Sequence, residues 1–105
     1  MTPKLSAAII PKVAIEGRIT VDTSDEMRRK LLAALHSKPT QVTVDLSKAT
    51  YLDSSGVATL VESVRIARRQ DTRLVLAGLS GQPRALLGVA QLDRLFEFAP
   101  QETST

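Results

Sequence analysis

Asp53-Ser54-Ser55-Gly56 follows an apolar run and opens a segment with the pattern of an amphipathic helix. The motif places two hydroxyls and a carboxylate at the N-terminal end of that helix, where free backbone N–H groups and the helix dipole favour negative charge. Asp53 or Ser54 can cap the helix by accepting a hydrogen bond from one of these N–H groups. A phosphate on a hydroxyl here would meet a favourable field. We therefore expect the motif to be modified or bound by another protein, and not to catalyse a reaction itself.

The sequence on either side of the motif alternates predicted strands and helices. Apolar residues three or four positions apart predict a helix from the motif to about Gln70. Alternating apolar residues predict a strand over about 41–46, and a connection is expected at 47–50. A short continuous apolar run at 74–77 is typical of a strand covered on both faces.

The N-terminal part predicts further strands, followed by one helix. Strands are expected at 5–10 and 13–15, and a third at 19–21 after a bend at 17–18. Thr23 followed by Glu26 has the spacing of a capping box, which predicts the start of a helix over about 24–36.

The C-terminal part predicts shorter elements. Pro83 suits the first position of a helix, which should continue to about Gly88. A short helix or turn is expected at 92–96 and an extended piece at 96–98. The resulting element order predicts an α/β fold, with helices packed mainly on one face of a mixed sheet. We expect residues 1–105 to form one domain, with its core at about 5–98 and a loose tail at 99–105.

Composition narrows the functional classes. The chain has 105 residues, 43% of them hydrophobic and 3% aromatic, with a net charge of +3. Few aromatic residues and dispersed basic ones argue against direct nucleic-acid binding. No apolar run approaches the roughly 18 residues that a membrane-spanning helix needs, and no secretory signal is recognised, so we expect a cytoplasmic protein without membrane insertion.

Enzymatic and metal sites are not expected. The chain has no cysteine, which excludes thiolate catalysis and cysteine-type zinc sites. His36 is the only histidine, and it lies near the predicted end of another helix, so no serine hydrolase is indicated. No His/Asp/Glu grouping has metal-ligand spacing, and we expect neither a cofactor nor a metal.

Four stretches of the chain form a recognisable combination: residues 44–47, 51–57, 74–80 and 92–96, the last of which reads Leu92-Asp93-Arg94-Leu95-Phe96. Together they resemble the STAS domains, a family that includes bacterial anti-sigma factor antagonists, the tails of sulfate transporters and small subunits of lipid-transport ABC complexes. The resemblance covers about residues 12–98.

The resemblance implies a phosphorylation switch. In the antagonist branch, the serine after the motif's aspartate is phosphorylated by a partner anti-sigma factor serine kinase, and Ser54 occupies that position. The expected function is to bind this kinase while Ser54 is unphosphorylated, and so to release a sigma factor. The residues expected to contact the partner are Asp22, Thr23, Asp53, Ser55, Gly56, Val57 and Thr59.

The family resemblance leaves a second function open. The same domain could be the small subunit of an Mla-like lipid-transport ABC complex and bind its ATPase subunit. In that case Ser54 need never be phosphorylated. The sequence alone favours the antagonist, but it does not exclude the transport accessory.

Overall fold

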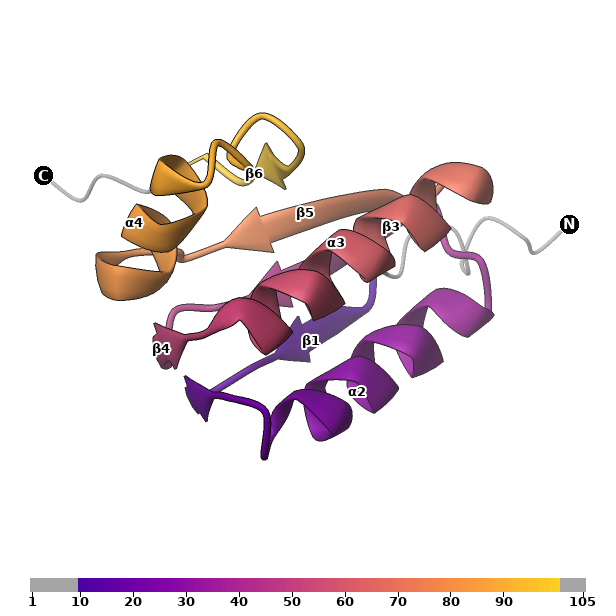
Figure 1. Ribbon diagram of the computed structural model, residues 1–105. Coiled ribbons are helices and arrows are strands. Elements are labelled where there is room, and N and C mark those ends of the chain that lie inside the picture. Colours follow the sequence, from indigo (N-terminus) through magenta and orange to yellow (C-terminus); the bar gives the residue numbers. More distant parts are fainter. Residues whose placement is uncertain (1–9, 101–105) are drawn as a thin grey trace, which may run out of the picture.

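Residues 10–100 are described by the computed structural model, in which helices cover parallel strands (Figure 1). The elements in chain order are β1 (Lys12–Ala14), β2 (Gly17–Ile19), α2 (Ser24–His36), β3 (Gln41–Asp45), β4 (Ala49–Leu52), α3 (Ser54–Arg69), β5 (Arg73–Ala77), α4 (Gly81–Val89) and β6 (Glu97–Phe98). One sheet has the order β1-β3-β5-β6, and β2 pairs with β4 in a second, two-stranded sheet.

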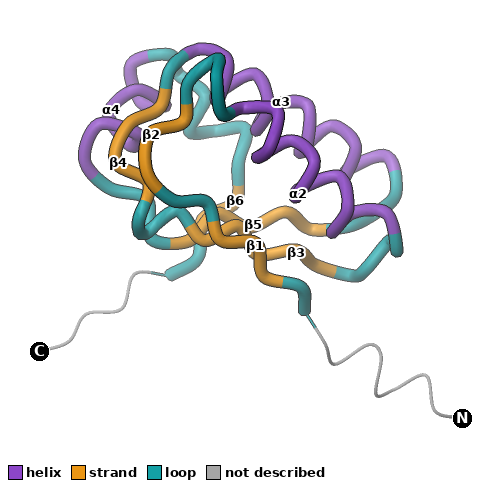
Figure 2. The backbone as a smooth tube through the Cα atoms, turned by 90° about the horizontal axis from the view of Figure 1, so that it is seen from below, coloured by secondary structure: helices purple, strands orange, loops and turns teal. Residues whose placement is uncertain are grey.

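The two longer helices lie side by side on the same face of the four-stranded sheet (Figure 2). Helix α4 packs instead against β4. This arrangement confirms the predicted α/β fold with helices mainly on one face. It follows from the connections, because parallel neighbours need a crossover and a helix supplies it.

The predicted mixing of strand directions is not seen in the described residues. Every strand pair between residues 10 and 100 is parallel. Most of the strand expected at 5–10 lies outside the described residues. The same is true of residues 101–105 of the tail expected at 99–105. The described sheet is parallel because α2, α3 and α4 each bring the chain back to the end of the sheet at which the strands begin, before the next strand starts.

The buried side chains of the helices and of the strands form one hydrophobic core. Val42 and Val44 of β3 are fully buried, whereas the three residues of the strand that alternate with them are half-buried. Leu31 of α2 and Leu60 of α3 are also fully buried, and they belong to the same apolar cluster. Each such side chain stabilises the fold by about 1.5–3 kcal/mol relative to an exposed one.

Two short strands differ from the sequence-based expectation. The predicted bend at 17–18 is part of β2, and the chain turns later, at residues 20–23. The predicted connection at 47–50 is wrong in its second half, where Ala49 begins β4. Both strands are held by pairing with each other, a tertiary contact that a weak local pattern does not reveal.

Helix α2 has its predicted bounds but not its predicted cap. Thr23 is the N-cap residue, yet its side chain accepts no hydrogen bond from the first turn of the helix. The hydroxyl instead donates to the carbonyl of Arg18 at 2.9 Å and accepts from the N–H of Thr20, also at 2.9 Å. The capping box is therefore wrong, because Thr23 closes the preceding turn.

Candidate partner-binding site

Asp53 caps helix α3, as one of the two sequence alternatives predicted. Its backbone is extended, with φ −106° and ψ −173°, and this directs the carboxylate back over the first helical turn. Oδ1 accepts hydrogen bonds from the N–H groups of Ser55 at 2.9 Å and Gly56 at 3.2 Å. Two N–H groups that lack a partner within the helix are thereby satisfied. We call residues 53–56 the Ser54 corner.

The cap also keeps the carboxylate of Asp53 charged. The hydroxyl of Ser55 donates to Oδ1, and this bond is the main cause that lowers the pKa of Asp53 below its ordinary value. Backbone N–H groups of Gly56, Ser55 and Val21 lower the pKa further, against the opposing effect of desolvation. Hydrogen bonds to a charged carboxylate favour that form.

The two serines of the motif differ in what their hydroxyls do. The Ser55 hydroxyl is committed to Asp53 at 2.5 Å, and the residue is half-buried. Ser54 is exposed, and within residues 10–100 its hydroxyl makes no hydrogen bond. Ser54 is therefore the more accessible acceptor for a phosphoryl group, at the helix terminus where an added anion is favoured.

Two of the residues expected to contact a partner point inward. Gly56 is buried, and a Cβ there would lie 2.5 Å from Leu52 Cδ1 and 2.9 Å from Ile19 Cγ2. Thr59 is 6% exposed, and its hydroxyl donates to the carbonyl of Ser55. Gly56 and Thr59 therefore support the corner from the core side, and contact of either residue with a partner stays a prediction. Val57 is half-buried and keeps some accessible surface.

The loop with Asp22 and Thr23 lies beside the Ser54 corner, as the sequence-based hypothesis requires. Asp53 donates its N–H to the carbonyl of Ile19, immediately before this loop, at 3.1 Å. The N–H of Val21 in turn contributes to the charged state of Asp53. Asp22 and Thr23 are both exposed, so the two segments form one accessible surface.

Three neighbours of this surface were not foreseen from the sequence. Val21 is 73% exposed at the tip of the loop. The Arg18 guanidinium lies 4.5 Å from the centroid of the Tyr51 ring. Arg18 and Tyr51 are partners in the β2–β4 register, so only knowledge of that pairing could have joined them.

Gln82 of α4 supports the strand that leads to the corner. Its Oε1 accepts from the N–H of Leu52 at 2.8 Å, and its Nε2 donates to the carbonyl of the same residue at 2.9 Å. The side chain thus replaces a neighbouring strand on the edge of β4 that faces away from β2. A residue 30 positions away in sequence helps to set where Asp53 begins α3.

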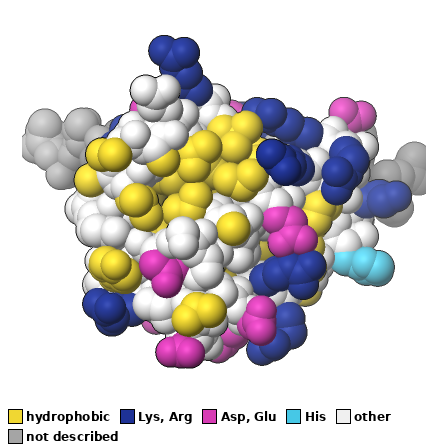
Figure 3. Space-filling view, viewed as in Figure 1, with side chains coloured by type: hydrophobic (Ala, Val, Ile, Leu, Met, Phe, Trp, Pro, Cys, Tyr) yellow, Lys and Arg dark blue, Asp and Glu magenta, His cyan; other side chains and the backbone are white. Residues whose placement is uncertain are grey.

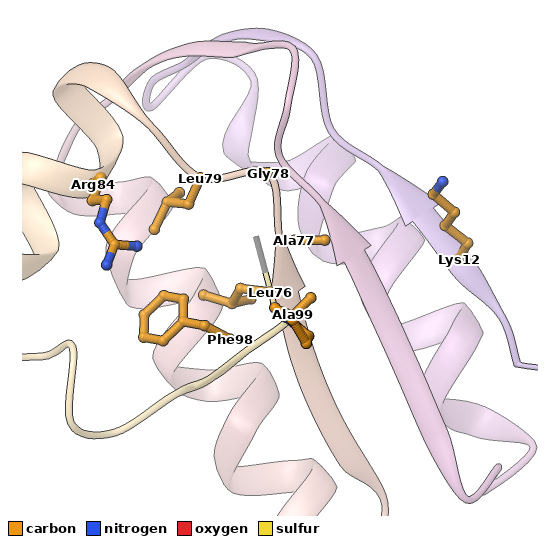
Figure 4. A pocket seen from close by; sticks show the side chains of 9 residues that line it. Lys12, Leu76, Ala77, Gly78, Leu79, Arg84, Phe98 and Ala99 are labelled. Atoms are coloured by element: carbon orange, nitrogen blue, oxygen red, sulfur yellow. The ribbon is translucent and has the colours of Figure 1, made fainter. Parts of the chain in front are cut away.

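The Ser54 corner is a surface site and not a cavity. A hollow of about 560 Å³ lies elsewhere, next to the ends of β5 and β6 (Figure 4). Arg84 and Phe98 lie on one side of it, with the guanidinium 5.2 Å from the ring centroid, and Lys12 lies on the other. None of the residues that line this hollow is among the predicted site residues.

Residues 10–100 contain neither a cluster of metal-ligand side chains nor a membrane-spanning helix. No three His, Cys, Asp or Glu residues between positions 10 and 100 come together as metal ligands would. Among the helices of the same range, none combines the length and apolarity that crossing a bilayer requires.

Comparison with protein families gives one match over most of the chain. Residues 6–97 match the family described as "Mlab, STAS domain". Among curated proteins, YvdB of Bacillus subtilis (strain 168), which is named as a sulfate transporter, is 31% identical over 74 residues. The match covers 70% of this chain but only 14% of YvdB.

Solved structures share the fold at low identity. An anti-sigma factor antagonist from Mycobacterium paratuberculosis has a TM-score of 0.78 and 20% identity, over 88% of this chain and 78% of its own. The anti-sigma factor antagonist SpoIIAA in its unphosphorylated form has a TM-score of 0.65 and 16% identity. This match covers 88% of the present chain and 79% of SpoIIAA. At these identities the likeness establishes the architecture alone.

Proposed function

The chain belongs to the STAS domain family, and on that premise we propose that it is an anti-sigma factor antagonist whose binding is switched by phosphorylation of Ser54. Unphosphorylated, it binds an anti-sigma factor serine kinase through the Ser54 corner and the loop with Asp22 and Thr23. The kinase then releases its sigma factor. This function places the chain in the cytoplasm as a protein-binding module and not as an enzyme.

The observation that carries the proposal is the difference between the two serines. Ser54 offers an exposed hydroxyl at the start of α3, while the Ser55 hydroxyl is bound to the cap. A phosphate adds about −1.5 to −2 charges, and a helix N-terminus stabilises such charge by roughly 0.3–1 kcal/mol. The charged Asp53 offsets part of that gain.

The same phosphate has a larger effect in an interface. Desolvation and repulsion there cost about 3–4 kcal/mol, which corresponds to a loss of affinity on the order of a few hundredfold. The phosphorylated domain therefore stays folded but loses its partner. SpoIIAA, whose structure is named for its unphosphorylated form, supports this proposal by analogy of fold.

The binding test compares two aspartate variants by calorimetry. The titrant is the anti-sigma factor kinase that co-purifies with the chain from its native cell. We expect Ser54→Asp to weaken binding by a few hundredfold, because the new charge lies in the interface. Ser80→Asp is the matched control, since Ser80 is the exposed N-cap of α4, and it should bind like the wild type. Equal affinity of Ser54→Asp and wild type would rule out the switch.

The phosphorylation test separates the two serines. The kinase and ATP should add one phosphate, which mass spectrometry locates on Ser54. Ser54→Ala should abolish the modification, and Ser55→Ala should retain it. Phosphate found on Ser55 in the wild type would contradict the assignment made from the hydrogen bonds.

A second candidate function is favoured by a separate observation. The matching family description includes the name Mlab, and YvdB is named for transport. We therefore keep the small subunit of an Mla-like lipid-transport ABC complex as the alternative, with the Ser54 corner bound to the ATPase subunit. Co-purification with an ATPase and a permease, without a sigma-binding kinase, would replace the first proposal by the second.

A further inference from the structure

Helix α3 carries a continuous stripe on its outer side. The stripe starts at Ser54 and continues through Val57, Val61, Arg65 and Arg68, which are three or four positions apart and so share one face. Ser54 and both arginines are exposed, and both valines are half-buried. We call these five residues the α3 stripe. Its length is about 21 Å at 1.5 Å per residue, close to four helical turns.

A segment that follows α4 lies beside the C-terminal end of the stripe and carries two more apolar side chains. Leu92 and Leu95, which follow α4, are half-buried beside the core in the same way as the valines. Arg68 donates from Nη2 to the carbonyl of Leu95 at 2.9 Å, which holds this segment against α3. Figure 3 shows apolar side chains gathered in one area of this face, with Lys and Arg side chains beside it.

Charge distinguishes this stripe from an ordinary solvated helix face. Within residues 10–100 neither Arg65 nor Arg68 has an ion-pair partner, and the carboxylate of Glu62 is held by Arg28 at 2.8 Å. The helix dipole accounts for an arginine in the last turn. It does not account for Arg65, which lies before the last turn, or for the apolar surface that Val57 and Val61 keep accessible while they pack against the core.

We propose that the α3 stripe binds an acidic amphipathic helix of the kinase. Apolar side chains of that helix would lie against Val57, Val61 and the two leucines, and its carboxylates against Arg65 and Arg68. This inference rests on the proposed function, because a partner that reaches Ser54 already covers the start of the stripe. The arrangement gives the partner a direction, with its acidic end remote from the phosphorylation site.

Charge reversal tests the basic half of the stripe. By calorimetry with the purified co-purifying kinase, Arg65→Glu should bind about tenfold more weakly, and Arg65→Glu with Arg68→Glu about a hundredfold. The wild-type affinity should fall as salt rises, and the double variant should show less of this dependence. Arg29→Glu is the matched control, because Arg29 is also an exposed arginine but lies on α2, and it should bind within about twofold of the wild type.

A second variant tests the apolar half. Val61→Asp should weaken binding on the order of a hundredfold, because it places a charge in the covered surface. Thermal melting checks that the variant is folded. Arg65→Glu changes an exposed side chain that makes no hydrogen bond or ion pair within residues 10–100, whereas Arg68→Glu also removes the bond to Leu95, so Arg65→Glu alone keeps the test decisive if Val61→Asp unfolds.

The possible results separate the two proposals. If Ser54→Asp loses the kinase but every stripe variant binds like the wild type, the stripe inference is overturned and the switch stands. If the wild type binds no such kinase, both are overturned. Sedimentation velocity tests whether a second copy of the chain, and not the kinase, binds to the stripe. A wild-type dimer that Val61→Asp converts to a monomer would overturn the inference, and a wild-type monomer agrees with it.

Discussion

At the scale of the single residue, the Ser54 corner assigns a different role to each polar group. Asp53 satisfies backbone N–H groups, Ser55 holds Asp53, and only Ser54 keeps a hydroxyl directed to solvent. Because Asp53 remains charged, a phosphate on Ser54 would add to an existing negative charge. In the proposed interface the two charges would have to be desolvated together, which weakens the binding of a partner that fits the unphosphorylated form.

Gly56 is a residue whose role depends on its surroundings. Gly56→Ala should destabilise the fold by about 1–2 kcal/mol, because the new methyl group collides with Leu52 and Ile19, which are buried and cannot move aside freely. The better helix propensity of alanine offsets only part of this cost. Urea unfolding followed by circular dichroism measures the difference.

Gly88 provides the matched control for that substitution. It also lies in a helix, but nothing is within 4 Å of the position a Cβ would occupy. Gly88→Ala should therefore stabilise the protein by roughly 0.5–1 kcal/mol. If both alanine variants shifted stability in the same direction, the packing role of Gly56 would be wrong.

At the scale of the element, β4 is the strand that positions the start of α3. It pairs with β2 on one side, and on the other side Gln82 takes the place of a strand at Leu52. The two-stranded sheet is too short to be stable alone, so it depends on α4. The Ser54 corner is therefore coupled to α4 through the two hydrogen bonds that Gln82 makes with Leu52.

Removing those two bonds gives a prediction about β4. Gln82→Leu should destabilise the protein by about 2–4 kcal/mol, because it leaves the N–H and carbonyl of Leu52 without partners. In a hydrogen-exchange experiment, the protection factor of the Leu52 amide should decrease at least tenfold. The Asp53 amide, which bonds to Ile19 across β2, is the internal control and should change less. An unchanged Leu52 amide would contradict the role given to Gln82.

At the scale of the whole molecule, surface carboxylates make the fold sensitive to acid. Four of them have pKa values below their ordinary ones: Asp45 through the N–H of Ser47, Asp53 through Ser55, Glu62 through Arg28 and Glu97 through Arg73. A lowered folded-state pKa adds stability that is present above the unfolded value, about 4, and is lost as the pH falls through the folded value.

We therefore expect the urea concentration at the unfolding midpoint to be constant near neutral pH. It should decrease once the pH is lowered below about 4. The contribution of each carboxylate is small because all four are exposed to solvent screening. Glu62→Gln removes one of the four and should reduce the fall without abolishing it. A midpoint that does not change between pH 6 and pH 3 would contradict this account.

The sequence by itself determined the long helices, the two strands predicted at about 41–46 and at 74–77, which the structure has at 41–45 and 73–77, and the position of the Ser54 motif at a helix start. Those features depend on local periodicity and on the capping preference of aspartate, which short stretches carry on their own. That residues 1–105 form one domain stays a prediction.

Tertiary structure decided the rest. Strands β2 and β4 have weak patterns and exist through their mutual pairing, and the Thr23 hydroxyl serves a turn that only the folded chain brings to it. The different roles of Ser54 and Ser55, the support from Gln82 and the contact of Arg18 with Tyr51 likewise depend on residues that the fold brings together. Local propensity encodes neighbours in the chain, whereas a binding surface is made by neighbours in space.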